Sequence, residues 1–430
     1  MTIDPQDQPG LSPALARGLT SRRMSRRNMI KLGGVSVGAL SLSSILAACA
    51  GSSSSAGSGG TSGGGTTVNF DPSTATDALN FSNWPLYIDK AHGGYPSLDK
   101  FKEGTGITVS YKDEINDNPS FFGELLPQLQ AGQDTGRDIV VITNGEYLSA
   151  LIQNGWATEL DPKYHPNFDA NAASWAKSPA YDPGNLHSMA WQSGITGIGW
   201  NTELAIKAPT KLDDLMSTEY FPPKTVGILK EDGPNLVMIN LGIDPIDSTQ
   251  DDWNEAAAWL TQLRDSDTFY AAYDQGYVDD LKAGNLAGTM AWSGDVLYYK
   301  IWEARPFEFI MAPQGGLLWI DNMLIPAHSK NPAGALEMMD FFYTPEIAQM
   351  VTEYVLYMSP VPEVQKLIAQ HAKDEQAKDP AYAKQLAETA ANPLLWPDEA
   401  LLQNVSFGRP LTTDAESNAW HATFDPIWET

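Results

Sequence analysis

Aromatic side chains stand close to carboxylates at several points of this 430-residue sequence. The segments "WSGD" and "WID" pair Trp292 with Asp295 and Trp319 with Asp321. Such pairs suit an alkylammonium ion, because the face of an aromatic ring attracts a cation and a carboxylate accepts charge-assisted hydrogen bonds. The clusters therefore predict recognition of an amine.

Two further segments carry the same types of residue. "NWPLY" contains Trp84 and Tyr87, and "KEDGPN" contains Asp232. Apolar and polar residues alternate from Leu79 to Ser82, which predicts a short strand. Pro85 makes the preceding residue extended and ends the strand, so both rings are expected at a strand end.

Each cluster also has a plain structural explanation. Most aromatic residues pack in the interior, and an aspartate before a helix commonly caps it, so Trp292, Trp319, Asp295 and Asp321 could each be structural. Four clusters in one chain weaken that explanation without excluding it.

Signatures of catalysis are missing from the sequence. There is no HExxH among the six histidines, no GxSxG and no phosphate loop, and the glycines of "SGITGIGWN" have the wrong spacing for a dinucleotide site. Cys49 is the only cysteine, which leaves no disulfide and no thiolate metal site. We therefore expect no catalytic residue, no cofactor and no metal.

The elements that must position these residues follow an alternating pattern. The segment "DDWNEAAAWLTQLRD" places Trp253, Ala256, Leu260 and Leu263 on one helical face. Helical segments of this kind alternate with strand-like runs, which indicates an α/β protein. The predicted strands cover residues 106–112, 137–143, 224–229, 286–292 and 318–326.

The N-terminus resembles an export signal that is not part of the fold. Arg26 and Arg27 precede Lys31 and an uncharged stretch, which resembles a twin-arginine signal. "LAAC" then ends the stretch like the lipobox of bacterial lipoproteins, with Cys49 as the lipidated residue. A transmembrane anchor is the alternative, but the stretch is shorter than the ~20 residues that a span needs.

A folded body on a flexible tether is expected after this signal of residues 1–49. Residues 50–77 form the predicted tether, and residues 50–67 are almost entirely Gly, Ser, Thr and Ala. The net charge of −26 argues against binding to nucleic acid. The sequence thus predicts an extracytoplasmic protein, held on a membrane by a lipid and monomeric.

From about residue 78 to 410 the chain resembles the bacterial spermidine/putrescine-binding proteins, the extracytoplasmic receptors of polyamine ATP-binding-cassette importers. The matching pieces include "FKEGTGITVSY", "DIVVIT", "GITGIGWN", "WSGD" and "LYMSP", in this order. The most specific piece runs from Gly315 to Gln349.

The resemblance implies a type II periplasmic-binding-protein fold, with two α/β lobes, crossover strands and a ligand cleft between the lobes. It places residues 78–195 and 292–350 in the first lobe and residues 196–291 and 351–430 in the second. A membrane permease is the implied partner. The cleft residues carried over from the family are Trp84, Tyr87, Thr143, Asn144, Asp232, Trp292, Asp295, Trp319, Asp321 and Tyr357.

Two positions depart from the family pattern. Leu86 stands where many members have a carboxylate, and Asn235 stands where some have a glutamate. A buried ammonium ion is costly without an anionic partner, so a ligand shorter or less charged than spermidine is expected.

Other functions fit parts of the pattern. Sugar receptors also use tryptophan walls, and Tyr298 with Tyr299 resembles the tyrosine pair of iron-binding relatives of this fold, although neighbouring helical residues point about 100° apart and favour one core and one surface position. An extracellular glycoside hydrolase would use paired carboxylates. A purely structural surface lipoprotein would bind no ligand.

Overall fold

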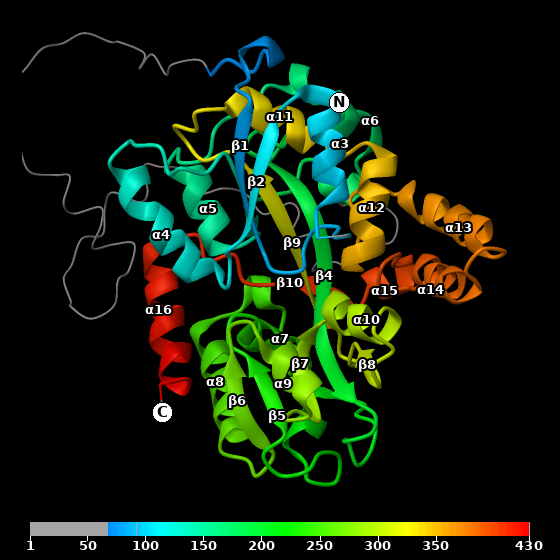
Figure 1. Cartoon of the computed structure of the whole chain (residues 1–430). Helices are drawn as coiled ribbons and strands as arrows, with labels where there is room; N and C mark the ends of the chain where they lie inside the picture. Colours follow the sequence, from blue (N-terminus) through cyan, green and yellow to red (C-terminus); the bar gives the residue numbers. More distant parts are fainter. Residues whose placement is uncertain (1–67, 92, 430) are drawn as a thin grey trace, which may run out of the picture.

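A computed structural model describes residues 68–91 and 93–429, and it has the expected mixed α/β architecture (Figure 1). The sheet runs in the order β2-β1-β3-β9-β4-β7-β5-β6, with β10 paired to β9 and β8 paired to β4. Its strands are β1 (Ala78–Asn83), β2 (Thr108–Asp113), β3 (Ile139–Thr143), β4 (Ser188–Asn201), β5 (Val226–Leu229), β6 (Phe269–Tyr273), β7 (Gly288–Trp292), β8 (Phe307–Ile310), β9 (Gly316–Leu324) and β10 (Val405–Phe407). The strands expected from the sequence are therefore confirmed, with shifts of about two residues at their ends.

The long strand β4 connects two halves of the molecule, which we call the first and second lobes (Figure 1). All 14 of its residues are buried, as are all nine residues of β9, its antiparallel neighbour. A strand that is buried on both faces needs a layer of protein on each side. Because β9 also pairs with β3 of the first lobe and β4 also pairs with β7 of the second, these two central strands connect the lobes.

The first lobe is built on parallel strands. β1 pairs with β2 and β3 in parallel, and helices pack on these strands around one hydrophobic core. Its helices are α3 (Pro96–Thr105), α4 (Asn118–Gln130), α5 (Glu146–Gln153), α6 (Pro166–Asn171), α11 (Pro332–Phe341), α12 (Pro345–Val355), α13 (Val364–Glu375) and α14 (Pro380–Ala391).

The second lobe repeats this construction around a second core. β5 pairs with β6 and β7 in parallel. Its helices are α7 (Gly233–Asn240), α8 (Gln250–Arg264), α9 (Tyr277–Ala283), α10 (Ser293–Ile301) and α16 (Asp414–Phe424), while the short α15 (Glu399–Leu402) lies in the segment between α14 and β10. Helix α8 buries Trp253, Ala256, Leu260 and Leu263, which confirms the helical face expected from the sequence.

The last ten residues of the expected tether are folded. Pro72–Thr74 form a 3-10 turn, and Phe70 is buried in the first core. The backbone N–H of Thr76 donates to Oδ1 of Asn331 at 3.1 Å. A buried aromatic ring and a backbone bond hold this segment on the lobe, which leaves residues 50–67 as the predicted tether.

Core membership also differs from the predicted lobe boundaries. Residues of α12, α13 and α14 pack in the first core, whereas residues of α10 pack in the second. The boundaries stay predictions, and the packing favours a division in which Ser293–Ile301 belong to the second lobe and residues 351–391 to the first. The chain thus crosses between the lobes at later positions than the resemblance implied.

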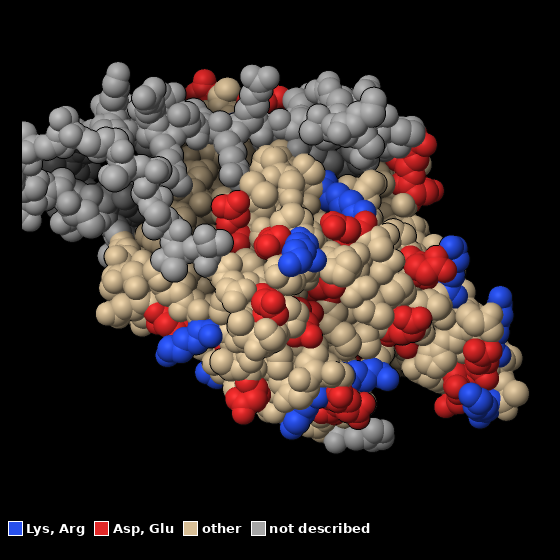
Figure 2. Space-filling view, turned by 90° about the horizontal axis from the view of Figure 1, so that it is seen from above, with Lys and Arg blue, Asp and Glu red and all other residues tan. Residues whose placement is uncertain are grey.

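The predicted export signal, with Arg26, Arg27 and Cys49, lies outside the described residues. Within residues 68–91 and 93–429, no helix combines the length and the apolar character that a membrane span requires. On the face shown in Figure 2, acidic and basic side chains lie interspersed with neutral ones.

Candidate ligand-binding cleft

The carboxyl ends of the parallel strands in both lobes point towards one cleft. In the first lobe these ends are at Asn83 of β1 and Thr143 of β3, and in the second lobe at Leu229 of β5, Tyr273 of β6 and Trp292 of β7. The loops that follow β1, β5 and β6 all line one cavity. Ligands of open α/β sheets bind at such strand ends, so the topology itself creates the candidate site.

The cavity has a volume of about 70 Å³ and is lined by five aspartates, three of which (Asp232, Asp295 and Asp321) were expected from the sequence, so we call it the aspartate chamber. It brings together nine of the ten residues expected from the sequence, which are Trp84, Tyr87, Thr143, Asp232, Trp292, Asp295, Trp319, Asp321 and Tyr357. Leu86 also lines the chamber, at the rim, with 46% of its surface exposed.

Asp321 lies on β9 and is held by two hydroxyl groups of the first lobe. Thr143 donates to its Oδ1 at 2.6 Å, and Tyr87 donates to its Oδ2 at 2.8 Å. Thr143 is also its cross-strand neighbour in the β3–β9 pair. Strand register and the loop after β1 thus fix the position of this carboxylate.

Asp295 lies in the first turn of α10 and is held by two tyrosines. Tyr357 donates to its Oδ1 at 2.8 Å, and Tyr277 donates to its Oδ2 at 3.0 Å. The same hydroxyl of Tyr277 accepts the backbone N–H of Trp292 at 3.0 Å. Asp295 therefore does not serve as a helix cap, and its carboxylate belongs to the chamber.

Asp232 directly precedes α7, and one of its carboxylate oxygens accepts two hydrogen bonds from neighbouring side chains. Its Oδ2 accepts hydrogen bonds from Thr196 at 2.5 Å and from the indole N–H of Trp292 at 2.8 Å. The indole N–H of Trp319 in turn donates to Thr196 at 3.1 Å. Two tryptophans and one carboxylate are thus joined into one network.

The rings of the chamber are both core residues and cavity walls. Trp84, Tyr87, Trp319 and Tyr357 are buried in the first core. The ring of Tyr357 lies 5.3 Å from that of Tyr87 and 5.3 Å from that of Trp319, between ring centroids. The interior and the ligand-binding interpretations of these aromatics are therefore compatible.

Two glycines allow these rings to pack closely. A Cβ atom on Gly194 would lie 2.4 Å from the ring of Trp319, and one on Gly294 would lie 2.5 Å from the ring of Tyr357. Both glycines belong to the motifs "GITG" and "WSGD", whose physical role the sequence did not reveal. Any larger residue at either position would displace a ring of the chamber.

Burial changes the acidity of the three aspartates. It raises the pKa of Asp295 to about 6, against the opposing effect of the bonds from Tyr357 and Tyr277. It likewise raises the pKa of Asp321 to about 6 and raises that of Asp232. A carboxylate that lacks a cationic partner in a dry site favours its neutral form, and a bound cation would reverse this.

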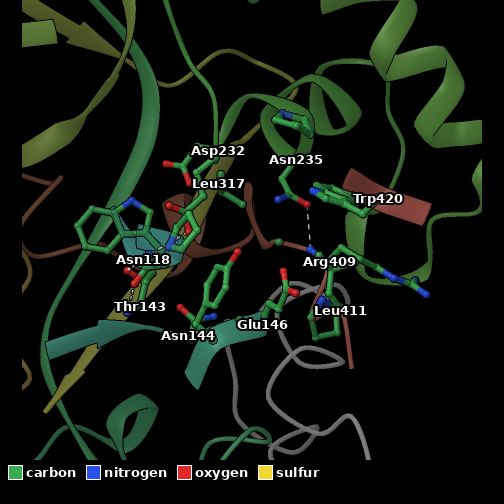
Figure 3. Close-up of a pocket in the computed structure, with 18 of the residues that line it drawn as sticks. Asn118, Thr143, Asn144, Glu146, Asp232, Asn235, Leu317, Arg409, Leu411 and Trp420 are labelled. Carbon is green, nitrogen blue, oxygen red and sulfur yellow. Dashed lines mark hydrogen bonds between the residues drawn. The ribbon is translucent and has the colours of Figure 1, made fainter. Parts of the chain in front are cut away.

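A larger cavity of about 250 Å³ adjoins the chamber and shares Asp232, Thr143 and Trp319 with it (Figure 3). Asn144 lines this second cavity only. Its Oδ1 accepts the backbone N–H of Ile320 at 2.6 Å, so it anchors the loop after β3 to β9.

Asn235 also lies in the larger cavity. Its Oδ1 accepts a hydrogen bond from the backbone N–H of Arg409 at 2.9 Å (Figure 3). This bond fixes residues 407–411, which also line the larger cavity. The departure from the family pattern at this position therefore has a structural role of its own.

Direct contacts join the two lobes across the cleft. The amide N–H of Asn118 donates to Glu231 at 2.9 Å. Ser417 on α16 donates to Glu146 on α5 at 2.5 Å, and His421 lies 3.4 Å from the same carboxylate. The C-terminal helix therefore closes one side of the cleft.

The structure adds cleft residues that the sequence did not single out. Glu231 and Asn118 line both cavities, and Gln275 lines the chamber. Burial and the charge of Asp232 raise the pKa of Glu231, although solvent reaches its side chain and moderates the rise. Glu231 could have been found from "KEDGPN", where it precedes Asp232, whereas Tyr277 and Gln275 carried no local signal.

The tyrosine pair lies apart from the chamber. Tyr299 is buried in the second core, and Tyr298 is half-buried with its hydroxyl 3.5 Å from that of Tyr354. One core and one partly exposed position confirm the expected arrangement. Within residues 68–91 and 93–429, no group of three or more His, Cys, Asp or Glu side chains is placed to hold a metal ion.

Residues 97–384 match the family described as bacterial extracellular solute-binding protein, and the chain belongs to this family. It is 26% identical over 307 residues to the spermidine/putrescine-binding periplasmic protein of Salmonella typhimurium, a match that covers 71% of this chain and 83% of the relative. It is 27% identical over 300 residues to a putrescine-binding periplasmic protein of Pseudomonas aeruginosa, covering 65% and 77%.

The fold agrees with that of a solved member. The crystal structure of the spermidine/putrescine ABC transporter substrate-binding protein of Streptococcus pneumoniae superposes with a TM-score of 0.63 at 22% identity. The match covers 82% of this chain and 98% of that protein. The two-lobed periplasmic-binding-protein fold expected from the sequence is thereby confirmed.

Proposed function

We propose that the protein binds a polyamine of the putrescine or spermidine type in the aspartate chamber. The observation that carries the proposal is a set of three aspartates, the buried Asp321 and the half-buried Asp232 and Asp295, among aromatic rings, with no Lys or Arg among the described residues that line the chamber. Such a site lacks its counter-charge until a cation enters. Ammonium groups supply that charge, and the rings hold the methylene chain.

A short diamine agrees with the two departures from the family pattern. The apolar Leu86 at the rim and the engaged Asn235 supply no further charge, which supports a ligand shorter than spermidine.

Delivery to a membrane permease completes the proposal. The curated relatives are named as polyamine-binding proteins of the periplasm, and the family comprises solute-binding proteins rather than enzymes. We infer that the lobes close on the ligand, that the closed form docks on an ATP-binding-cassette permease, and that no substrate is turned over.

The N-terminal sequence supports an anchored location. Arg26 and Arg27 fit export by the twin-arginine route, and Cys49 fits lipidation, so the monomeric body would be held at the outer face of a membrane by residues 50–67.

The proposal is tested by a thermal-shift screen of residues 68–430 against putrescine, spermidine, sugars, amino acids and ferric iron. A ligand that binds only the folded state raises its melting temperature. We expect putrescine to give the largest rise. A rise with a sugar or with iron, and none with any amine, would replace the proposed ligand class.

A further inference from the structure

One polar atom of the aspartate chamber has no partner within the part of the chain that the structure describes. Oε1 of Gln275 is shielded from solvent and accepts no hydrogen bond. Asp232, Asp295 and Asp321, by contrast, all accept bonds from hydroxyl or indole groups. An unpaired buried acceptor costs free energy, so its persistence in a ligand cavity calls for a reason.

The backbone around Gln275 is firmly placed. Gln275 lies in the short connection between β6 and α9, next to Gly276, which has φ +83° and begins the helix. The following residue, Tyr277, is fully buried and donates to Asp295 at 3.0 Å. Gln275 directly precedes a left-handed glycine and an anchored tyrosine, so its backbone is positioned before a ligand binds.

A hydrogen-bond donor on the ligand would pair with Oε1 of Gln275. An amide oxygen is a neutral acceptor, so it takes an N–H or O–H donor and adds no charge. The chamber is already lined by five aspartates and Glu231, which attract a cation. A protonated primary amine brings three N–H donors and can bond to a carboxylate and to the amide oxygen at once.

We propose that Gln275 is a specificity-determining residue of the chamber and that its Oε1 accepts a hydrogen bond from an N–H of the bound ammonium group. The inference rests on the proposed function and deepens it. Gln275 would select ligands that have an N–H donor at this position, while Asp232, Asp295 and Asp321 would select ligands that carry positive charge.

The test compares two substitutions of opposite effect. Gln275→Met keeps the size of the side chain but removes the acceptor, whereas Gln275→Glu keeps an acceptor and adds charge. Calorimetric titration with putrescine should show affinity about tenfold or more lower for Gln275→Met and affinity equal to or higher than the parent for Gln275→Glu. Gln370→Met, on the exposed side of α13, is the matched control and should bind like the parent.

A second measurement separates ligand binding from a structural role. Because the oxygen is unpaired without ligand, Gln275→Met should melt at or above the temperature of the ligand-free parent. Unchanged putrescine affinity of Gln275→Met would overturn the inference, as would an equal loss in both variants with lowered melting temperatures. Failure of the parent itself to bind any polyamine would overturn the proposed function instead.

Discussion

The hydroxyl of Tyr87 donates a hydrogen bond to Oδ2 of Asp321 over 2.8 Å, although 234 positions separate the two residues in the chain. Tyr87 follows the first strand of the fold, and Asp321 lies on the strand that returns between the lobes. The bond links an aromatic wall to a carboxylate, and this pairing recurs between Tyr357 and Asp295. The chamber therefore depends on tertiary contacts throughout.

Removal of one carboxylate should strongly weaken polyamine binding. We expect Asp295→Asn and Asp321→Asn to lower putrescine affinity by about 30-fold to several thousand-fold, because loss of one member of a buried charge pair costs ~2–5 kcal/mol. Trp84→Leu should cost less, since a ring contributes only cation–π and contact energy. Titration calorimetry measures each loss.

The control for these variants is Asp279→Asn, which removes an equal charge from the exposed side of α9. It should bind like the parent. If both chamber variants bound as tightly as the parent while keeping its circular dichroism spectrum, polyamine binding in this chamber would be refuted.

Affinity should depend on pH through the same two groups. In the ligand-free protein the pKa values of Asp295 and Asp321 are raised to about 6, whereas a bound ammonium ion favours the ionised carboxylates. Putrescine binding should therefore weaken as the pH falls below about 6 and release protons near that pH. Calorimetry in two buffers of different ionisation enthalpy measures the proton release, and its absence would contradict the raised pKa values.

The stability of the ligand-free protein should show the opposite trend. Between about pH 4 and pH 6 the folded state holds protons on Asp295 and Asp321 that the unfolded state has lost. Their contribution to the free energy of unfolding therefore falls as the pH rises through this range. The parent should lose more stability over this range than the double variant Asp295→Asn/Asp321→Asn, as chemical denaturation would measure.

A methyl group on Gly294 should damage the chamber. Alanine usually stabilises a helix relative to glycine by about 1 kcal/mol. Here the added Cβ would lie 2.5 Å from the ring of Tyr357, which holds Asp295, so we expect Gly294→Ala to destabilise the protein by about 1–3 kcal/mol and to weaken putrescine binding. Gly104→Ala on α3 is the control, since nothing lies within 4 Å of its added Cβ. Equal melting temperatures for the two variants would refute the steric explanation.

The contact between α16 and α5 should favour the closed arrangement of the lobes. Ser417→Ala removes the hydroxyl that bonds Glu146, so the ligand-free variant should have a larger radius of gyration than the parent, and putrescine should restore compactness. Small-angle scattering measures both states. Ser120→Ala, at the exposed start of α4, should leave the radius unchanged. Identical scattering of all three proteins would show that this contact does not hold the lobes.

Export and anchoring are tested on the full chain. Replacement of Arg26 and Arg27 by lysine should block export, because the twin-arginine route requires the arginine pair. Cys49→Ala should release the protein from membranes into the soluble fraction. Cell fractionation measures both, and membrane retention of Cys49→Ala would contradict lipid anchoring.

Local sequence patterns were sufficient to predict several strands and helices and the chemical types of residue in the site. Apolar-polar alternation located β1 and a helical apolar face located α8, because an element with one buried face has apolar residues at its own period, whereas β3 and β7 were located as strand-like runs. The aromatic and carboxylate pairs of "WSGD" and "WID" indicated an amine for a similar reason, since neighbours in the chain remain neighbours in the fold.

Which distant residues share a cavity could not be predicted, because it depends on how the elements pack. The packing of the second lobe placed Gln275 in the chamber and the hydroxyl of Tyr277 against Asp295, and α16 reached α5 of the first lobe, with no local signal for these contacts. The raised pKa values arose in the same way, because burial depends on the surroundings of a carboxylate rather than on its neighbours in sequence. The sequence specifies the residue types, whereas distances between side chains, their burial and the presence of unpaired atoms are set only when the lobes pack.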